Sequence, residues 1–258
     1  MAPVPQSDTP WFVGAFDRTW LRLYSHRNDA EAQQSAPHIV HLLGLGGGDR
    51  LIDIACGAGR YARAFATLGL RVTGTDLSDD LLDVARESSP GLPGAPAYSR
   101  IDSRRLPFRQ QFDGAVSLFT SFGYFDTRAD DVALFRGARR ALVRGGRFLL
   151  DFLNEAQVRA NLPADNEEDR GDLRMQFKRR IAEGPAGLSV FKHVNVTDRR
   201  SGRPITEFEE RVRLYSADEI DGLLEDAQLA PVGQRLGNVN GTPHDAQSPR
   251  LIRVAERK

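Results

Sequence analysis

Apolar runs alternate with amphipathic segments between residues 49 and 154. The runs are short and aliphatic, as in strands buried on both faces, and the segments between them have helical spacing. This alternation predicts an α/β fold with a mostly parallel sheet and helices on both faces. We expect strands at 51–55, 71–76, 97–101, 112–119 and 147–153. We expect three helices between them: one at 60–68, one that begins after Ser78 as its cap, and one at 127–143.

Helical spacing also covers residues 11–45, in two pieces joined by the polar link 24–28. Both pieces carry apolar faces, so one interpretation is two helices that pack on the sheet. The other interpretation is a lid whose polar link faces a ligand. The residues alone leave both open.

The pattern changes after Asn154. Residues 155–170 are polar and acidic, and three alternating segments then predict an antiparallel β meander that stands on the sheet. A helix at 217–227 follows, with Ser216 and Glu219 spaced for a capping box. The meander strands are expected at 173–181, 188–197 and 205–214, and the last two strands at 229–236 and 251–255. The chain thus divides into an N-terminal lid (1–48), a ligand-binding core (49–154), a β insertion (155–215) and the rest of the core sheet (216–258).

The first core strand runs into a glycine-rich turn that opens a helix at Arg60. Gly57 and Gly59 allow a tight turn and a close approach of the backbone to a ligand. The free N–H groups of the helix favour a carboxylate or a phosphate. The spacing also fits the GxGxxA form of the dinucleotide fingerprint, so an NAD-dependent oxidoreductase stays open.

Acidic residues stand at or near the carboxyl ends of three successive strands, where ligands bind in such sheets. Asp76 is placed to accept hydrogen bonds from ribose hydroxyls, and Asp102 from an adenine amino group. Asp53 lies four residues before Gly57, where it would repel a pyrophosphate and attract a sulfonium or ammonium group. The three acids therefore favour an adenosine ligand with a cationic tail.

The amino-acid composition limits the kinds of partner and compartment that we expect for this protein. Lys and Arg number 35 against 35 Asp and Glu, so no basic surface argues for nucleic acid. The single cysteine, Cys56, excludes an internal disulfide and suggests a reducing compartment. We find no signal peptide and no span for a membrane, and expect a cytoplasmic protein. His38 and His41 have helical spacing but no third ligand nearby, so we predict no metal site.

Several of these segments resemble, in order, the motifs of class I S-adenosylmethionine-dependent methyltransferases. The matching segments are 51–62, 72–86, Asp102 with 106–108, 112–116 and 142–148. The phrase Thr-Ser-Phe-Gly-Tyr-Phe at 120–125, together with 24–27 and 240–251, resembles a bacterial subgroup that acts on small molecules. The fourth strand lacks the Asp/Asn-Pro-Pro-Tyr phrase of many enzymes that methylate nucleic acids or glutamine.

The resemblance implies a Rossmann-like sheet with an antiparallel last strand, and S-adenosyl-L-methionine as the cofactor. It implies a small-molecule acceptor, methylated on nitrogen rather than oxygen, and allows a homodimer formed by the β insertion. A non-catalytic, cofactor-binding regulator on the same fold is the alternative. The implied cofactor residues are Arg27, Asp53, Cys56, Gly57, Gly59, Leu118 and Phe119 for the methionine part, Asp76 for the ribose, and Leu77, Asp102 and Ser103 for the adenine.

Methyl transfer from a sulfonium is an in-line displacement, so a base is needed only when the acceptor enters protonated. His244, in the loop between the last two strands, is our first candidate base, and His26 on the lid is the second. Tyr24 and Tyr124 are candidates for orienting the acceptor. The alternatives are an exposed loop histidine and ordinary aromatic packing.

Overall fold

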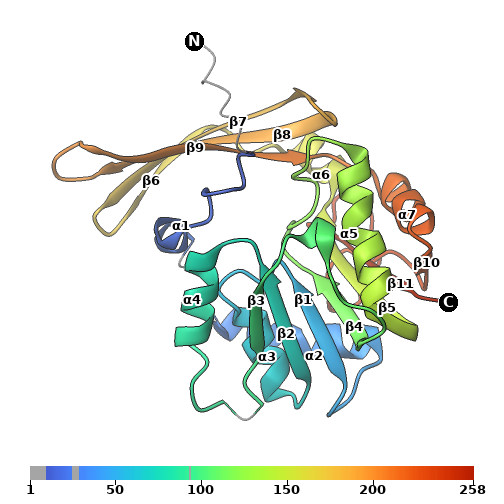
Figure 1. Ribbon diagram of the computed structural model, residues 1–258. Coiled ribbons are helices and arrows are strands. Elements are labelled where there is room, and N and C mark those ends of the chain that lie inside the picture. Colours follow the sequence, from blue (N-terminus) through green and yellow to red (C-terminus); the bar gives the residue numbers. More distant parts are fainter. Residues whose placement is uncertain (1–9, 25–28, 93) are drawn as a thin grey trace.

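The computed structural model describes residues 10–24, 29–92 and 94–258 (Figure 1). Its core is a seven-stranded sheet with the strand order β10-β11-β5-β4-β1-β2-β3. The five central and outer strands β5, β4, β1, β2 and β3 run parallel, and β11 is antiparallel to β5. The strands are β1 Arg50–Ile54, β2 Arg71–Asp76, β3 Ala97–Arg100, β4 Phe112–Ser117, β5 Leu142–Leu153, β10 Ala230–Pro231 and β11 Arg250–Glu256. The predicted fold class is confirmed.

Helices cover both faces of this sheet, which explains the continuous apolar runs. Leu51 of β1 packs with side chains of α2 and α3, whereas its neighbour Ile52 packs with side chains of α5 and α7 on the opposite face. Helix α4 lies beside β2 and β3. The helices are α1 Arg18–Leu23, α2 Asp29–Leu43, α3 Arg60–Thr67, α4 Asp79–Glu87, α5 Arg128–Ala141, α6 Glu155–Ala160 and α7 Ala217–Asp226, with a 3-10 turn at Ser103–Arg105.

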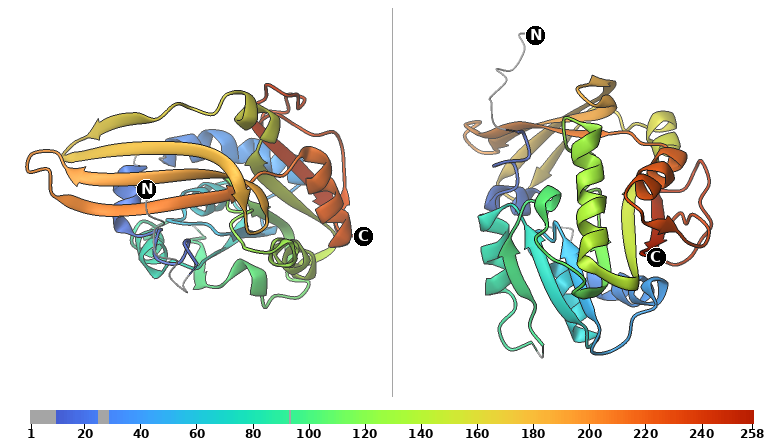
Figure 2. Two further views of the ribbon diagram at one scale, coloured as in Figure 1. Left: turned by 90° about the horizontal axis from the view of Figure 1, so that it is seen from above. Right: turned by 45° about the vertical axis from the view of Figure 1, so that its right-hand side comes forward.

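A second, antiparallel sheet with the order β6-β7-β8-β9 lies across the carboxyl ends of the core strands, above α1 (Figures 1 and 2). Its strands are β6 Asn166–Arg170, β7 Leu173–Gly184, β8 Gly187–Asp198 and β9 Pro204–Arg213. The three predicted meander strands are confirmed. The first strand, β6, was not predicted, because its residues (Asn, Glu, Glu, Asp, Arg) have low β propensity. Cross-strand contacts of Asp169 with Arg174 and of Glu167 with Gln176 support it at the sheet edge.

Three predicted boundaries were wrong for local reasons. Residues 11–17 form turns rather than helix, because Gly14 has φ +92° and Asp17 caps the helix that begins at Arg18. Strand β5 begins at Leu142 and takes in the glycines expected to precede it, with a register shift against β4. The predicted strand at 229–236 shortens to the two residues of β10, followed by a bridge from Leu236 to Ile252.

Helix α7 begins with the predicted capping box. The Ser216 hydroxyl accepts from the Glu219 N–H at 3.2 Å, and the Glu219 carboxylate accepts from the Ser216 N–H at 2.9 Å. Replacing Ser216 with alanine leaves one N–H of the first turn without its acceptor. We expect the free energy of unfolding to fall by about 1 kcal/mol in urea titrations. Ser88→Ala, at the exposed carboxyl end of α4, is the control and is expected to change it by less than about 0.5 kcal/mol. Equal effects of the two changes would contradict the capping argument.

Candidate active site

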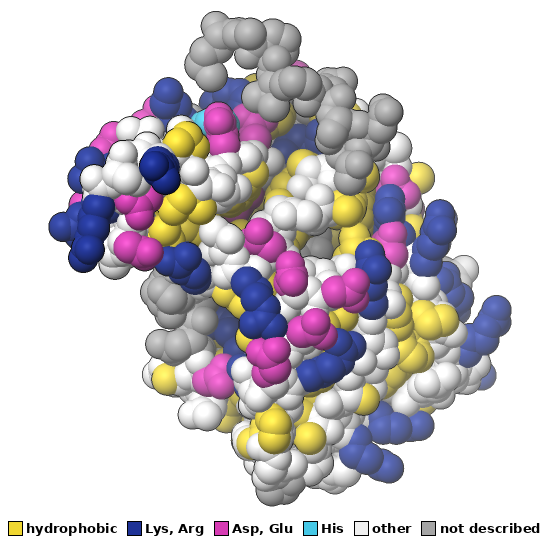
Figure 3. Space-filling view, turned by 60° about the vertical axis from the view of Figure 1, so that its left-hand side comes forward, with side chains coloured by type: hydrophobic (Ala, Val, Ile, Leu, Met, Phe, Trp, Pro, Cys, Tyr) yellow, Lys and Arg dark blue, Asp and Glu magenta, His cyan; other side chains and the backbone are white. Residues whose placement is uncertain are grey.

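A cavity of about 510 Å³ opens at the carboxyl ends of β1, β2 and β4, under the second sheet. The glycine-rich turn, the start of α4 and the segment 118–125 line it on the core side, and residues 12–24 line it on the other side. Hydrophobic side chains lie in the hollow beneath the overhanging sheet, and acidic and basic side chains are mixed around it (Figure 3). The volume lies in the range of small-molecule and cofactor sites.

The glycine-rich turn is built as its sequence requires. Gly57 lines the cavity with φ +55°, a backbone conformation that side chains with a Cβ rarely adopt. Gly59 also has a positive φ, and packing leaves no room for a side chain there. A Cβ at this residue would lie 2.5 Å from the Tyr98 Oη and 2.9 Å from the Ala85 Cβ. The turn thus brings α3 against α4 and leaves the backbone of Gly57 exposed to the cavity.

Asp76 ends β2 at the floor of the cavity. Its carboxylate accepts hydrogen bonds from the N–H groups of Gly57 (2.8 Å) and Ser78 (2.9 Å), one on each oxygen. Burial raises the pKa of Asp76, and the backbone hydrogen bonds oppose that rise. Because each carboxylate oxygen has two acceptor sites, the group can bind the turn and two ligand hydroxyls at once.

Asp53 is the most deeply buried acid of the cavity, with 2% of its surface exposed. Burial and, after it, the charge of Asp76 raise the pKa of Asp53 to about 7, although Arg60 opposes both effects. A cation bound beside Asp53 would offset this cost of burying a carboxylate. The neighbouring Cys56 lines the cavity too, but burial and the charges of Asp53 and Asp76 raise the pKa of its thiol, so a thiolate is disfavoured.

Asp102 lies at the cavity edge, where it caps the 3-10 turn and accepts from the Arg104 N–H at 2.9 Å. Burial would raise the pKa of Asp102, but the hydrogen bonds and the charge of Arg104 lower it overall. The Arg104 guanidinium also lies 4.9 Å from the ring centre of Phe125. The carboxylate expected to contact adenine is therefore already bound by a neighbouring arginine.

Aromatic rings make up much of the remaining wall. The rings of Phe16 and Tyr124 stack with their centres 6.0 Å apart, and the rings of Trp20 and Tyr24 lie 4.6 Å apart. Lys192 of β8 donates to the Tyr24 hydroxyl, which donates to Glu210 of β9 at 3.0 Å. The lining aromatic residues are Phe12, Phe16, Trp20, Tyr24, Tyr61, Phe119, Tyr124 and Phe125.

Arginines of the cavity wall were not predicted from the sequence. They are held in ion pairs with acids: Arg60 with Glu31 (2.5 Å), Arg63 with Asp29 (2.6 Å) and Arg100 with Asp79 (3.0 Å). The first two pairs tie α2 to the amino end of α3. An excess of Arg at the start of a helix, where acids are usual, is a sequence signal that could have indicated Arg60 and Arg63, but not Arg100 at the end of β3.

The structure brings together most of the predicted site residues. The lining includes Tyr24, Asp53, Cys56, Gly57, Asp76, Leu77, Asp102, Ser103, Leu118, Phe119 and Tyr124. His26 and Arg27 lie outside the described residues. His244 is among the described residues but does not line the cavity. Its backbone N–H donates to the carbonyl of Arg235. Burial and, after it, the charge of Arg235 lower the pKa of its imidazole.

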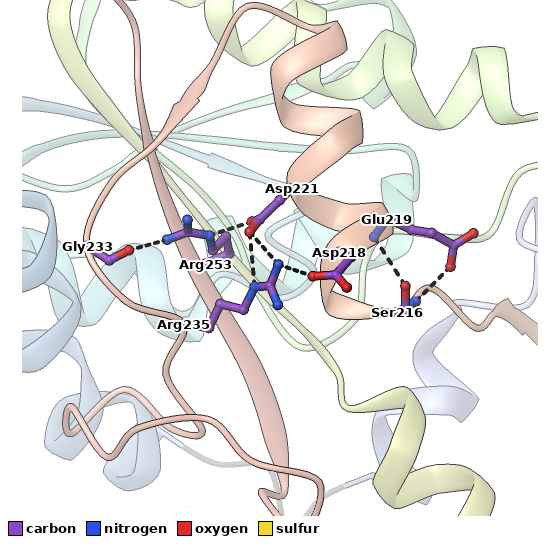
Figure 4. Close-up of polar contacts among 7 residues, drawn as sticks. All are labelled: Ser216, Asp218, Glu219, Asp221, Gly233, Arg235 and Arg253. Carbon is purple, nitrogen blue, oxygen red and sulfur yellow. Dashed lines mark hydrogen bonds and ion pairs between the residues drawn. The ribbon is translucent and has the colours of Figure 1, made fainter.

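Arg235 belongs to an ionic network that fixes α7 against β11 (Figure 4). Asp221 of α7 accepts from Arg253 at 2.5 Å and from Arg235 at 2.8 Å and 3.0 Å. Arg253 donates also to the carbonyl of Gly233 at 2.9 Å, and only 8% of its side chain is exposed. The network explains why the loop that carries His244 is anchored to α7.

Two absences apply to the described part of the chain. Within residues 10–24, 29–92 and 94–258 there is no cluster of His, Cys, Asp and Glu that could hold a metal ion. Over the same ranges, no helix has both the length and the apolar character needed to cross a bilayer.

The strand order, the antiparallel β11 and the acidic cavity at the carboxyl strand ends define the class I methyltransferase fold. Residues 51–146 match the family model described as "Methyltransferase domain". The chain is an S-adenosylmethionine-dependent methyltransferase, and the predicted cofactor is thereby confirmed. The NAD-dependent alternative is not supported.

Relatives agree with this class. The chain is 28% identical to the "Putative methyltransferase YqeM" of Bacillus subtilis, over 81% of this chain and 84% of that protein. It is 27% identical to the "Cypemycin N-terminal methyltransferase" of Streptomyces sp, over 82% and 84%. Among solved structures, the CcbJ methyltransferase of Streptomyces caelestis superposes with a TM-score of 0.80 at 19% identity, covering 98% of this chain and 99% of that one.

Proposed function

We propose that the enzyme transfers the methyl group of S-adenosylmethionine to a nitrogen atom of a small molecule. One observation carries the proposal: the aromatic rings of Phe16, Trp20 and Tyr24 line the cavity on the side opposite the glycine-rich turn. Aromatic faces favour cations. A methylated amine is cationic when it forms, whereas a methylated hydroxyl group is not, so such a wall stabilises amine methylation more.

We infer that the cofactor lies across the glycine-rich turn. Asp76 accepts from its two ribose hydroxyls, with Leu77 and the Ser103 backbone at its adenine. Asp53 and the carbonyls of Leu118 or Phe119 receive its methionine ammonium. The backbone of Cys56 and Gly57 also contacts the methionine part in this proposal. Arg27 binds the methionine carboxylate. When bound, the cofactor supplies an activated methyl group, so the protein needs no nucleophile of its own.

On the acceptor side, we assign the orienting role to Tyr24 and Tyr124. Tyr24 reaches the cavity from the end of α1, and its hydroxyl is held by Lys192 and Glu210, which pair directly across β8 and β9. The rings around these tyrosines exclude water from the reacting atoms. An in-line displacement requires that the acceptor be held in one orientation and that water be excluded from the reacting atoms. His244 and His26 stay predictions as bases.

The test is methyl transfer from S-adenosylmethionine labelled in the methyl group to a panel of matched pairs. Each pair consists of an amine (an amino sugar, an amino acid or a short peptide with a free amino end) and the corresponding hydroxyl compound. We expect labelled product only from amines. Transfer confined to the hydroxyl compounds would overturn the choice of nitrogen, and binding of S-adenosylhomocysteine without any turnover would contradict the catalytic proposal.

Removing the Tyr24 hydroxyl gives a narrower prediction. With the best amine of the panel, Tyr24→Phe is expected to lower kcat/KM about tenfold, the usual effect of one lost hydrogen bond to a charged group. The affinity for S-adenosylhomocysteine, measured by calorimetry, is expected to stay within about twofold. Tyr98→Phe is the matched control, since the Tyr98 hydroxyl bonds Ser89 and does not line the cavity. A similar loss in both variants would contradict the role given to Tyr24.

A further inference from the structure

The turn that follows β4 has an unusual backbone. Phe119 has φ +54° and Thr120 has φ +65°, so two successive residues with side chains adopt the left-handed conformation. This conformation is rare for residues other than glycine and most unfavourable for a β-branched residue such as threonine. It persists only where the surrounding structure holds it, and such strain is concentrated at functional sites.

Two residues hold this turn, one from the end of β5 and one from the start of β11. The Asp151 carboxylate accepts from the Phe119 N–H at 3.1 Å, and the Asp151 carbonyl accepts from the Thr120 N–H at 3.1 Å. Arg250 donates through Nε to the same carboxylate at 2.6 Å and through Nη2 to the Thr120 hydroxyl at 2.8 Å. Both N–H groups of the turn and the Thr120 hydroxyl are thus held by two paired residues, of which Asp151 is buried and Arg250 is half-buried.

These holding residues lie behind the cavity wall, whereas the turn itself forms part of the wall. Leu118 and Phe119 line the cavity, but Asp151 and Arg250 do not. Asp151 is buried, with 6% of its side chain exposed. The Phe119 ring packs under the Arg60 guanidinium, 4.2 Å from it, and 5.2 Å from the ring of Tyr61. The backbone of the turn therefore sets where this ring and the neighbouring carbonyls stand.

We propose that Asp151 and Arg250 are positioning residues for the amino-acid end of the cofactor, acting through the 118–120 turn. The inference rests on the proposed placement of the cofactor, in which the Leu118 or Phe119 carbonyl meets the methionine ammonium. The nucleoside end depends on Asp76 at the end of β2, which has no contact with this ion pair. Weakening the ion pair should therefore affect the two ends of the cofactor unequally.

The experiment compares two ligands by calorimetry in the variant Arg250→Lys. S-adenosylhomocysteine has both ends, whereas 5′-methylthioadenosine has the same nucleoside and no amino-acid group. Lysine keeps the positive charge beside Asp151, but its single ammonium lacks the planar fork that reaches Thr120 as well. We expect the Kd for S-adenosylhomocysteine to rise about tenfold and the Kd for 5′-methylthioadenosine to change less than about twofold.

Two further variants complete the test. Thr120→Val keeps the branched shape and removes the hydroxyl that Arg250 contacts, and we expect the same selective loss at about threefold. Arg253→Lys, on the same strand and paired with Asp221 outside the cavity, is expected to leave the ratio of the two Kd values unchanged. Equal weakening of both ligands in Arg250→Lys and Thr120→Val, or no weakening, would overturn the inference.

A failure of the cofactor placement would look different. Asp76→Ala is expected to weaken both ligands, since both carry the ribose. If it weakens neither, the placement is wrong. If it weakens both while Arg250→Lys is not selective, only the role of the ion pair is overturned.

Discussion

Replacing Asp76 with alanine is expected to weaken the binding of S-adenosylhomocysteine about 100-fold. The carboxylate loses two hydrogen bonds from ribose hydroxyls, and a hydrogen bond to a charged group contributes about 1.5 to 3 kcal/mol. The lower figure for two such bonds already gives a change of this size. Calorimetry with purified protein measures it directly, without knowledge of the methyl acceptor.

The control for this prediction is Asp83→Ala on the following helix. Asp83 is exposed and pairs with Arg86, away from the cavity, so the affinity is expected to stay within about twofold. Melting curves without ligand show whether the loss of the Gly57 and Ser78 hydrogen bonds also destabilises the fold. An unchanged affinity in a folded Asp76→Ala protein would remove Asp76 from the cofactor site.

Asp53 is expected to make cofactor binding depend on pH. In the free protein its pKa is raised to about 7, so the carboxyl is protonated at pH 6 and ionised at pH 8. A sulfonium and an ammonium favour the ionised form, so binding at pH 6 must release a proton. The association constant of S-adenosylmethionine should therefore rise about tenfold per pH unit up to pH 7 and level off above it. Calorimetry in buffers of different ionisation enthalpy measures both the constant and the proton release.

The raised pKa of Asp53 also makes the stability of the protein depend on pH. The sign of this dependence is opposite to that of an acid whose pKa is lowered by an ion pair. Because the folded pKa of Asp53 lies above the unfolded value, the folded state binds the extra proton between about pH 4 and pH 7. Stability of the free protein therefore falls as pH rises through that window, by up to about 4 kcal/mol for this group. Asp53→Asn should flatten both this fall and the pH dependence of binding.

Asp131 provides the matched control. It is buried beneath the Tyr215 hydroxyl, outside the cavity, and burial raises its pKa to about 6. Asp131→Asn should alter the dependence of stability on pH but leave the dependence of cofactor binding as it is. If Asp53→Asn binds S-adenosylmethionine with the unaltered pH profile, Asp53 does not face the cationic end of the cofactor.

The core of the fold could be predicted because its signals are local. Strands β1, β4 and β5 each have their own apolar run. The parallel topology brings the acids at the strand ends to the same edge of the sheet. Asp53 and Asp76, far apart in sequence, thus meet in one cavity as expected. The caps of α4 and α7 involve residues three apart, and both were predicted.

The acceptor side could not be predicted in the same way. The Tyr24 hydroxyl meets Lys192 and Glu210, which lie 168 and 186 residues further along the chain, and nothing in the local pattern announces that contact. Strand β6 depends on pairing with β7 rather than on its own residues. The Asp102–Arg104 pair is local, yet an arginine two residues after an acid is too common to have indicated an ion pair at the cavity edge.

Helix α1 is attached chiefly to the second sheet. Leu23 packs among Leu173, Met175, Phe177, Val194 and Val196, and Arg22 pairs with Asp172 of the β6–β7 turn. In the proposed function, the core holds the methyl donor, whereas α1 and the sheet that packs on it lie on the acceptor side. Divergence in residues 155–215 should therefore change which compounds the enzyme accepts while the donor site stays the same. An exchange of this segment between relatives is the natural route to new acceptors.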